Sequence, residues 1–388
     1  MSAGRASVDD RRYLNDVFER LCRIESPSGQ ESGCAEAVIQ ELRSLGLEPE
    51  EDSSQQQTGA DCGNLLARLD GGPGSSEQSI LLCAHLDTVP LAAPVEPTLL
   101  DGYWQNAAEG ILGADNKAAI AVILTLARKC AAQAPAVNLE LLFTVCEERS
   151  LLGARAFDVS RLCSAYGYVF DHASPIGEIV VSSPCHYRLE ATFRGAAAHA
   201  GIRPESGSSA ILAAAHAIAS MPHGRIDEQT TTNIGTIRGG SAINVVAESC
   251  ELQAEVRSLS EERAEQTLAR LVDLINEAAN RPECDCDVDV TVERTFAAYR
   301  LASSSPAVSL AASALQACGY EPELISSGGA SDANALIARG LPVVNLANGT
   351  EHNHEPGERV SVSALEGMLD VAMTLLQTAS AHASNDAR

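Results

Sequence analysis

The most regular feature of the chain is a set of short apolar runs that each end in acidic or histidine residues. Apolar runs of this length, bounded by turn residues, predict buried β-strands. The runs are 80–86, with His85 inside it and Asp87 directly after it, 139–146, followed by Glu147 and Glu148, and 166–170, followed by Asp171. Helical patterns such as 118–129 separate them, and ligands of open α/β sheets bind at the carboxyl ends of the strands. The pattern predicts an α/β domain whose polar side chains collect at one sheet edge.

From about residue 185 the pattern changes. The predicted elements are a strand at 186–194, a helix at 206–220, strands at 232–237 and 245–257, a helix at 261–279 and a strand at 286–292. This β-α-β-β-α-β order is the ferredoxin-like split βαβ arrangement, which forms a compact α+β domain. Helices at 306–318 and 363–379 and a strand at 342–346 then resume the first pattern. We therefore expect a first domain formed by residues 1–184 and 296–388, interrupted by a smaller domain at 185–295.

Composition excludes several classes of partner. The 388 residues are 45% hydrophobic, which suits two globular domains, and the formal net charge of -25 repels nucleic acids and anionic membrane surfaces. The N-terminus lacks the apolar core of a signal peptide, and the longest apolar runs, such as 118–127, are too short to cross a bilayer. The twelve cysteines are scattered, several of them in strand-like runs. We expect a reduced, cytoplasmic protein.

Several cofactor and nucleophile signatures do not fit. The glycines at 71–74 lack the spacing and the following helix of a dinucleotide site, which disfavours a nucleotide-dependent oxidoreductase. No Gly-x-Ser-x-Gly or Cys/His signature supports a covalent hydrolase. Cys284 and Cys286 are a lone pair without a second pair at zinc-finger spacing. Cys83 shares a strand face with His85 and offers a soft metal ligand, but the acid-rich surroundings favour a core thiol.

The residues after the strands have the chemistry of a metal site. His85 and Asp87 lie two apart, so they share a strand face and the acid can orient the imidazole. Asp115 stands just before a helical run, where a carboxylate serves either as an N-cap or as a ligand. Glu147 and Glu148 are adjacent, so both reach one site only if the backbone turns there.

The order of the motifs resembles that of the co-catalytic zinc exopeptidases and deacylases, which include peptidase T, carboxypeptidase G, acetylornithine deacetylase and aminoacylase. The motifs are Ala-His-Leu-Asp-Thr at 84–88, Gly-Ala-Asp-Asn-Lys at 113–117, Cys-Glu-Glu at 146–148, Phe-Asp at 170–171, Ala-His-Ala-Gly at 198–201, and Gly-Gly-Ala-Ser-Asp-Ala at 328–333 with His354. The match runs through nearly the whole chain and is most similar to the peptidase T branch. It implies a mixed-sheet catalytic domain interrupted by a lid or dimerisation domain.

The resemblance also implies roles for individual residues. Two divalent metal ions, zinc first and cobalt or manganese as alternatives, would be bound by His85, Asp115, Glu148, Asp171 and His354. In this arrangement Asp115 bridges the two ions, Glu147 is the general base and Asp87 orients His85. A cis peptide is expected between Asp115 and Asn116. His352 lies two residues from His354 and is a competing candidate, although the spacing from Asn345-Leu346 and to Val360-Ser361-Val362 favours His354.

On the inserted domain, His199 resembles the histidine that reaches the substrate carbonyl, often across a dimer interface. Asn244 and Arg257 resemble positions that contact substrate, and an arginine fork suits a terminal carboxylate. Without the resemblance, the three would be read as a surface histidine, a turn asparagine and a strand arginine. The resemblance implies a homodimer formed through this domain.

The function predicted is hydrolysis of an amide bond near the terminus of a small peptide, in the manner of a di- or tripeptide aminopeptidase, by a metal-bridged hydroxide with Glu147 as base. An N-acyl amino-acid deacylase or a carboxypeptidase of the same family is the alternative. A catalytically silent metal-binding or regulatory protein is the alternative from another class. It predicts loss of the base or of a ligand, and all six of these residues are present.

Overall fold

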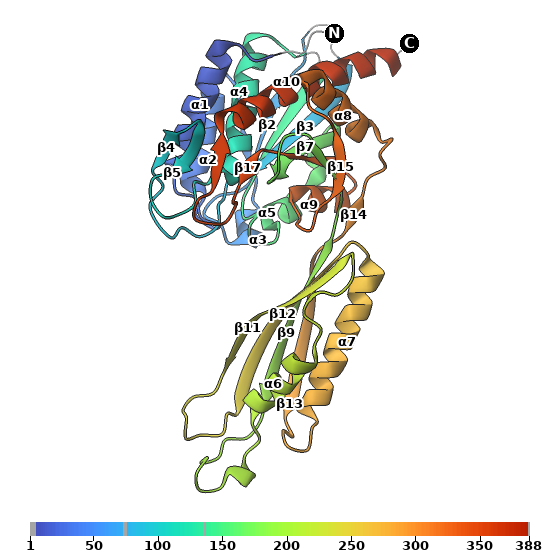
Figure 1. Ribbon diagram of the computed structural model, residues 1–388. Coiled ribbons are helices and arrows are strands. Elements are labelled where there is room, and N and C mark those ends of the chain that lie inside the picture. The colour runs from blue at the N-terminus through green and yellow to red at the C-terminus, as the bar shows by residue number, and fades with distance from the viewer. Residues whose placement is uncertain (1–4, 73–75, 136, 387–388) are drawn as a thin grey trace. The chain divides into compact units, whose positions relative to one another are not determined.

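The computed structural model describes residues 5–72, 76–135 and 137–386. The chain forms two compact units (Figure 1): Met1–Ser182 with Arg300–Arg388, here called the larger unit, and Ser183–Tyr299, here called the inserted unit. The second unit therefore interrupts the first, at positions within a few residues of the expected limits, 184/185 and 295/296.

A mixed sheet forms the centre of the larger unit. Its strands, in spatial order, are β1 (Glu50–Glu51), β2 (Leu65–Leu69), β6 (Val137–Thr144), β3 (Ser76–His85), β7 (Ser164–His172), β16 (Val343–Ala347), β8 (Glu178–Ser183) and β14 (Tyr299–Arg300), with β15 (Glu323–Ser326) paired to β8. The four central strands, β6, β3, β7 and β16, are mutually parallel. Parallel strands end at the same sheet edge, so the residues that follow these four strands meet there.

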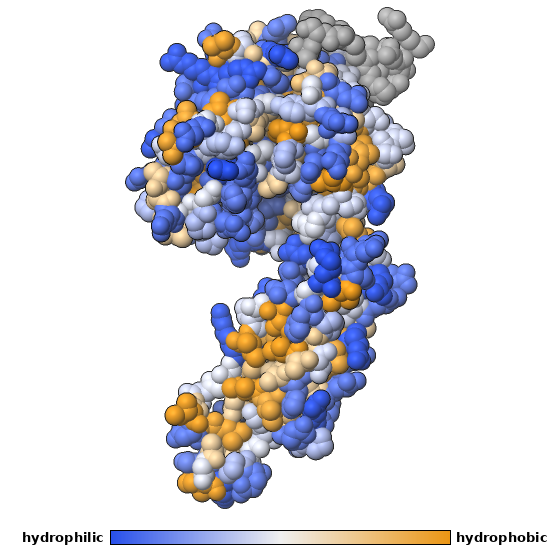
Figure 2. Space-filling model, viewed as in Figure 1, coloured by the Kyte–Doolittle hydropathy of each residue, from blue (hydrophilic) through white to orange (hydrophobic). Residues whose placement is uncertain are grey.

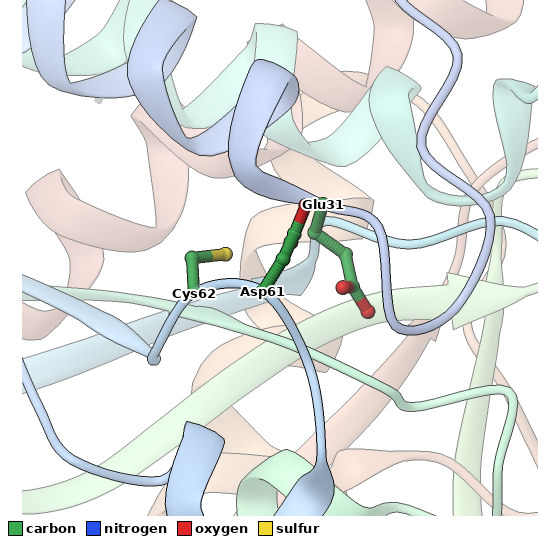
Figure 3. A group of neighbouring side chains, drawn as sticks. All are labelled: Glu31, Asp61 and Cys62. Atoms are coloured by element: carbon green, nitrogen blue, oxygen red, sulfur yellow. The ribbon is translucent and has the colours of Figure 1, made fainter.

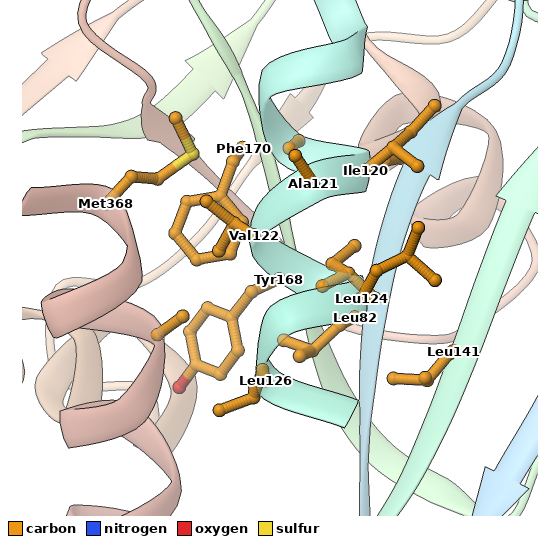
Figure 4. Packing of buried hydrophobic residues seen from close by; sticks show 14 of the residues in the cluster. Leu82, Ile120, Ala121, Val122, Leu124, Leu126, Leu141, Tyr168, Phe170 and Met368 are labelled. Atoms are coloured by element: carbon orange, nitrogen blue, oxygen red, sulfur yellow. The ribbon is translucent and has the colours of Figure 1, made fainter. Parts of the chain in front are cut away.

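Helices cover both faces of this sheet. They are α1 (Val8–Cys22), α2 (Ser32–Ser44), α3 (Gln55–Thr58), α4 (Ala114–Ala132), α5 (Leu152–Ala156), α8 (Pro306–Cys318), α9 (Asp332–Ala338) and α10 (Val362–Asp386). Alternate residues of β3 face opposite sides. Leu82 and Ala84 join the main core with residues of α4 and α10 (Figure 4), whereas Cys83 Sγ lies 3.8 Å from the carboxylate of Asp332 on α9. Each fully buried leucine or phenylalanine of this core stabilises the fold by roughly 1.5–3 kcal/mol.

A second, smaller sheet positions the loop that follows β16. It consists of β17 (Thr350–Glu351), β18 (Arg359–Ser361), β5 (Tyr103–Asn106) and β4 (Pro97–Leu100), all antiparallel. Because β17 and β18 pair, the segment 352–358 between them becomes a hairpin loop that carries His354.

The inserted unit contains β9 (Cys185–Arg194), α6 (Ala210–Ser220), β10 (Gly224–Arg225), β11 (Thr230–Gly239), β12 (Ser249–Ser258), α7 (Glu261–Ala279) and β13 (Asp287–Phe296). Its antiparallel sheet has the order β10-β11-β12-β9-β13. The side chains that point to one face of this sheet form a separate core with α6 and α7. The predicted fold class, an α/β unit interrupted by a ferredoxin-like α+β unit, is confirmed.

Two predicted element starts in the inserted unit are wrong. The helix begins at Ala210, because the side chain of Ser209 accepts the amide of Leu212 and caps it there. Strand β12 begins at Ser249, because residues 244–246 bond instead to the loop 198–200. Among the residues described, no helix combines the length and the apolar character needed to span a membrane.

The turn after β6 leaves no room behind Gly153. A Cβ at this position would lie 2.1 Å from the backbone oxygen of Val145, so Gly153→Ala forces the turn apart. We expect a loss of about 1–3 kcal/mol of stability, measured as a lower melting temperature. Gly33→Ala on α2 is the control, since its Cβ would come no nearer than 3.4 Å to an atom of Ile24. Equal melting temperatures for the two variants would contradict the packing argument.

Candidate metal centre

Asp115 lies between two histidines at the shared edge of the central strands. Its Oδ1 is 3.1 Å from His85 Nε2, and its Oδ2 is 3.2 Å from His354 Nε2. Each histidine has a second carboxylate beside it. His85 Nε2 is 3.6 Å from Asp171 Oδ1, and His354 Nε2 is 2.8 Å from Glu148 Oε1. The structure thus brings the five predicted ligands together from segments up to 269 residues apart.

Glu147 belongs to the same cluster. The nearest donor atoms of His85, Glu147 and Asp171 all lie within 4.8 Å of one another, and the same is true of His85, Asp115 and Glu148. His85 takes part in both groups, so the two form one continuous cluster of nitrogen and carboxylate donors.

Asp87 holds the turn that presents the two adjacent glutamates. Its carboxylate accepts the backbone amides of Glu147 at 2.9 Å and Glu148 at 3.1 Å. It also accepts the hydroxyl of Ser28 at 2.6 Å. The backbone leaves strand geometry at Cys146, whose φ is +51°, and this lets neighbouring acids reach one place.

Asp87 also lies beside the predicted ligand His85. His85 Nδ1 is 3.0 Å from the backbone oxygen of Asp87 and 3.4 Å from its Oδ1. The main-chain oxygen is therefore the nearer partner of this ring nitrogen, and the carboxylate is mainly engaged with the amides of the turn.

Glu31 supports the same turn from the other side, and sequence reasoning missed it. It is fully buried, and its Oε1 accepts the amides of Gly29 at 2.9 Å and Cys146 at 3.0 Å. Glu31 also forms a group with Asp61 and Cys62 (Figure 3). In that group Asp61 accepts the amide and the hydroxyl of Ser32 at the start of α2. Both acids of this group thus hold backbone amides.

Glu358 fixes the backbone at Asp115, and sequence reasoning missed this residue too. It is 1% exposed; its Oε2 accepts the amides of Leu112 and Gly113, both at 2.8 Å, and its Oε1 accepts the amide of Asp115 at 2.9 Å. The peptide bond between Asp115 and Asn116 is cis, as the resemblance implied. No local pattern distinguishes Glu358 from the exposed Glu355, because its partners lie more than 240 positions earlier in the chain.

Two asparagines complete the support of the ligands. Asn353 Nδ2 donates to Asp115 Oδ2 at 2.9 Å. Asn345, on β16, accepts the amide of Asp171 at 3.0 Å and donates to its backbone oxygen at 3.3 Å. Each asparagine therefore orients a candidate ligand.

The hairpin loop distinguishes between the two nearby histidines. His354 contacts Asp115 and Glu148, whereas the contact found for His352 is with Glu355, at 4.0 Å, in the exposed part of the loop. Cys83, the possible soft ligand, is buried, and its thiol faces Asp332 instead of the cluster.

The cluster concentrates buried charge. Burial and then the negative charge of Asp171 raise the pKa of Glu147 well above its usual value. Burial and the charge of Asp115 do the same to the pKa of Asp171. The hydrogen bonds that His354 donates to the carboxylates of Asp115 and Glu148 raise the pKa of His354 to about 10. Burial opposes a charged His85, but its contacts with Asp115 and Asp171 raise its pKa well above the usual range.

This donor set fits divalent cations. Histidine nitrogens and carboxylate oxygens are the ligands that zinc prefers in catalytic sites. Carboxylates this close oppose each other's ionisation, and cations placed among them would stabilise all of them as anions. The arrangement around Asp115, with one histidine near each of its oxygens and one further acid beside each histidine, suits two ions that share this carboxylate.

The three predicted residues of the inserted unit fall into two groups. His199 and Asn244 are exposed and lie in loops that pair with each other: His199 bridges to Val245, and the amide of Ala200 donates to the backbone oxygen of Asn244 at 3.0 Å. Arg257 lies at the opposite end of β12, where its guanidinium contacts Glu255.

Comparisons with known proteins agree with this architecture. The profile described as "Peptidase dimerisation domain" matches residues 185–283, and that of "Peptidase family M28" matches residues 64–170. An uncharacterised Bacillus subtilis protein, YqjE, is 33% identical over 96% of this chain and 99% of its own length.

Two solved structures are similar over nearly their full length. The aminopeptidase PepT of Bacillus cereus is 34% identical, covers 95% of this chain and 98% of its own, and superimposes with a TM-score of 0.84. A tripeptidase of Staphylococcus aureus is 30% identical, covers 96% and 99%, and has a TM-score of 0.89.

The support that Glu358 gives to Asp115 is testable by metal binding. In Glu358→Gln, the amide group replaces one acceptor oxygen with a donor, which faces backbone amides that are also donors. We expect about 10- to 100-fold weaker binding of Co²⁺, the loss typical of removing a residue that supports a ligand. Isothermal titration calorimetry measures the Co²⁺ affinity. Glu351→Gln, in the same hairpin but paired with Arg359, is the control, and equal affinities of the two variants would contradict the assigned role.

Proposed function

This chain belongs to the M20/M28 family of zinc exopeptidases, and from that membership we propose that it releases the N-terminal residue of small peptides, principally di- and tripeptides. As a member of this family it is a metallopeptidase. The names of the two similar structures, an aminopeptidase and a tripeptidase, support the choice of substrate.

The position of Asp115 is the observation that carries the proposal. One carboxylate with a histidine on each oxygen is what a pair of metal ions sharing a ligand requires. In the proposed site His85 and Asp171 would hold one ion, Glu148 and His354 would hold the other, and Asp115 would be shared by both. When bound, the two ions, zinc or alternatively cobalt or manganese, polarise the scissile carbonyl and lower the pKa of water.

Glu147 moves the proton in the proposed reaction. The oxygen of a water molecule bonds to the carbonyl carbon, and the water proton passes to the carboxylate of Glu147. The carbon–nitrogen bond then breaks, and Glu147 delivers the proton to the departing amine nitrogen. Asp87 supports this step by holding the backbone of Glu147 through its amide.

His199 and Asn244 are proposed to act on a substrate bound by a second copy of the chain. Strand β12 separates their loops from Arg257 by at least eight residues, or about 26 Å at the rise of an extended strand. A tripeptide spans only about 10 Å. Arg257 and the loops of His199 and Asn244 in one copy therefore cannot contact the same substrate. In a homodimer, one copy can supply Arg257 and the other copy the two loops. In this role His199 stabilises the negative oxygen that forms on the carbonyl.

The surface of the inserted unit suits such a dimer. Its dimerisation-domain profile covers most of the unit, and apolar residues gather on the face seen in Figure 2. The large apolar side chains exposed in this unit include Ile202, Ile211, Leu212, Ile237 and Ile243. Exposed apolar groups of this kind mark association surfaces.

The first test concerns the base. Glu147→Gln retains the shape of the side chain but cannot accept a proton, so we expect turnover to fall about 10²- to 10⁴-fold with the metal content unchanged. Metal analysis and a tripeptide hydrolysis assay on the same sample separate the two effects. Glu36→Gln, on the exposed side of α2, is the control. Wild-type turnover in Glu147→Gln would rule out Glu147 as the base.

The second test concerns the substrate. The panel contains dipeptides, tripeptides, C-terminally amidated tripeptides and N-acetyl amino acids, assayed with zinc, cobalt or manganese. We expect cleavage of tripeptides at the N-terminal bond. Arg257→Ala should raise KM for free-carboxylate tripeptides and leave amidated ones unchanged. Cleavage of acylated amino acids alone would indicate a deacylase, and release of the C-terminal residue would indicate a carboxypeptidase. If no substrate is cleaved although metal is bound, the protein is catalytically silent.

A further inference from the structure

Arg257 is held on β12 by Glu255, two residues earlier on the same strand face. Arg257 Nε donates to Glu255 Oε1 and Nη2 donates to Glu255 Oε2, both at 3.2 Å. This contact uses one edge of the planar guanidinium. The edge formed by Nη1 and the second Nη2 proton takes no part in it, and that edge matches the two oxygens of another carboxylate.

Glu255 is itself held from the neighbouring strand. His186 Nε2 on β9 lies 2.9 Å from Glu255 Oε2, and His186 Nδ1 lies 2.5 Å from the hydroxyl of Thr295 on β13. The imidazole stacks on Phe296 with ring centres 5.2 Å apart. The hydrogen bond from His186, and to a lesser extent the hydrogen bonds and the charge of Arg257, lower the pKa of Glu255 to about 2 against the opposing effect of burial. Three strands thus contribute to holding one carboxylate.

The register places this chain of contacts on one face of the sheet. His186 is the direct partner of Arg257 across β9 and β12, and of Phe296 across β9 and β13. Residues of β12 that point the other way, such as Val256, are buried in the core with α6 and α7. The contacts therefore lie on the face that the two helices leave uncovered.

A second pair on this face provides a comparison. Arg188 and Glu190 are also two apart, on β9, and form an ion pair. Gln253 Nε2 donates a hydrogen bond to Glu190 Oε1. Among the contacts of the described residues, no stacked histidine holds Glu190. Exposed ion pairs of this kind restrict a long side chain only weakly. The added contacts of His186 distinguish Glu255 from Glu190.

We propose that Glu255, supported by His186, is a positioning residue that holds the guanidinium of Arg257 by one edge and leaves the other edge directed at the C-terminal carboxylate of the substrate. This rests on the proposed function, in which Arg257 recognises that carboxylate. Glu255 acts through Arg257 and makes the enzyme select peptides with a free C-terminus.

The experiment measures kcat and KM for one tripeptide with a free C-terminus and for its C-terminal amide. In Glu255→Gln, the side chain still fits but no longer offers two negative oxygens. We expect KM for the free peptide to rise on the order of tenfold, as for loss of one well-placed hydrogen bond to a charged group. KM for the amide and kcat for both should stay unchanged. His186→Phe, which retains a stacking ring, should shift the ratio of the two KM values in the same direction.

Controls separate this inference from the proposed function. Glu190→Gln should leave both KM values unchanged, and in an Arg257→Ala background Glu255→Gln should add no further effect. If Glu255→Gln leaves the ratio of KM values unchanged while Arg257→Ala alters it, the inference is wrong and the proposed function stands. If Arg257→Ala leaves the ratio unchanged, the role of Arg257 fails and the inference fails with it. An unchanged ratio in His186→Phe would exclude His186.

Discussion

The carboxylate of Asp87 joins the ends of the neighbouring strands β3 and β6, and the geometry of the metal centre depends on it. It is fully buried and accepts two successive backbone amides and the hydroxyl of Ser28. Successive residues of a regular strand point in opposite directions. Because the amides of Glu147 and Glu148 converge on one acceptor, the backbone must turn, and both acids then reach the same cluster. Three donors compensate for burying this charge.

Other buried carboxylates around the cluster also accept backbone amides. Glu31 holds the amide of Cys146, and Glu358 holds the amide of Asp115. Buried carboxylates thus fix the backbone from which the ligand carboxylates project. The consequence is a cluster of buried acidic groups, and their joint ionisation is favourable only if positive charge is nearby. The histidines supply part of it, and the donor set is suited to divalent cations for the rest.

The candidate substrate contacts of the inserted unit lie on a sheet and its loops and not in a buried cluster of acids. Its antiparallel sheet is covered by helices on one face only, and the other face carries the ion pairs Arg188–Glu190 and Arg257–Glu255. The two groups of candidate substrate contacts lie at opposite ends of one strand, β12. A strand of this length therefore suits a homodimer in which the two ends of β12 in each copy contact different substrate molecules.

Several features followed from the sequence alone. The apolar runs that end in acids predicted the strands, their helices and the shared edge, and the motif order predicted the family, because hydrophobic period and residue chemistry are local properties. Short strands such as β8, β15, β17 and β18 were missed, since pairing across the chain creates them. The positions of His354 relative to His352, of Glu358 beneath Asp115 and of Glu255 beside Arg257 were decided only by the tertiary structure. A side chain's partner depends on segments brought together by folding, and no local pattern records that proximity.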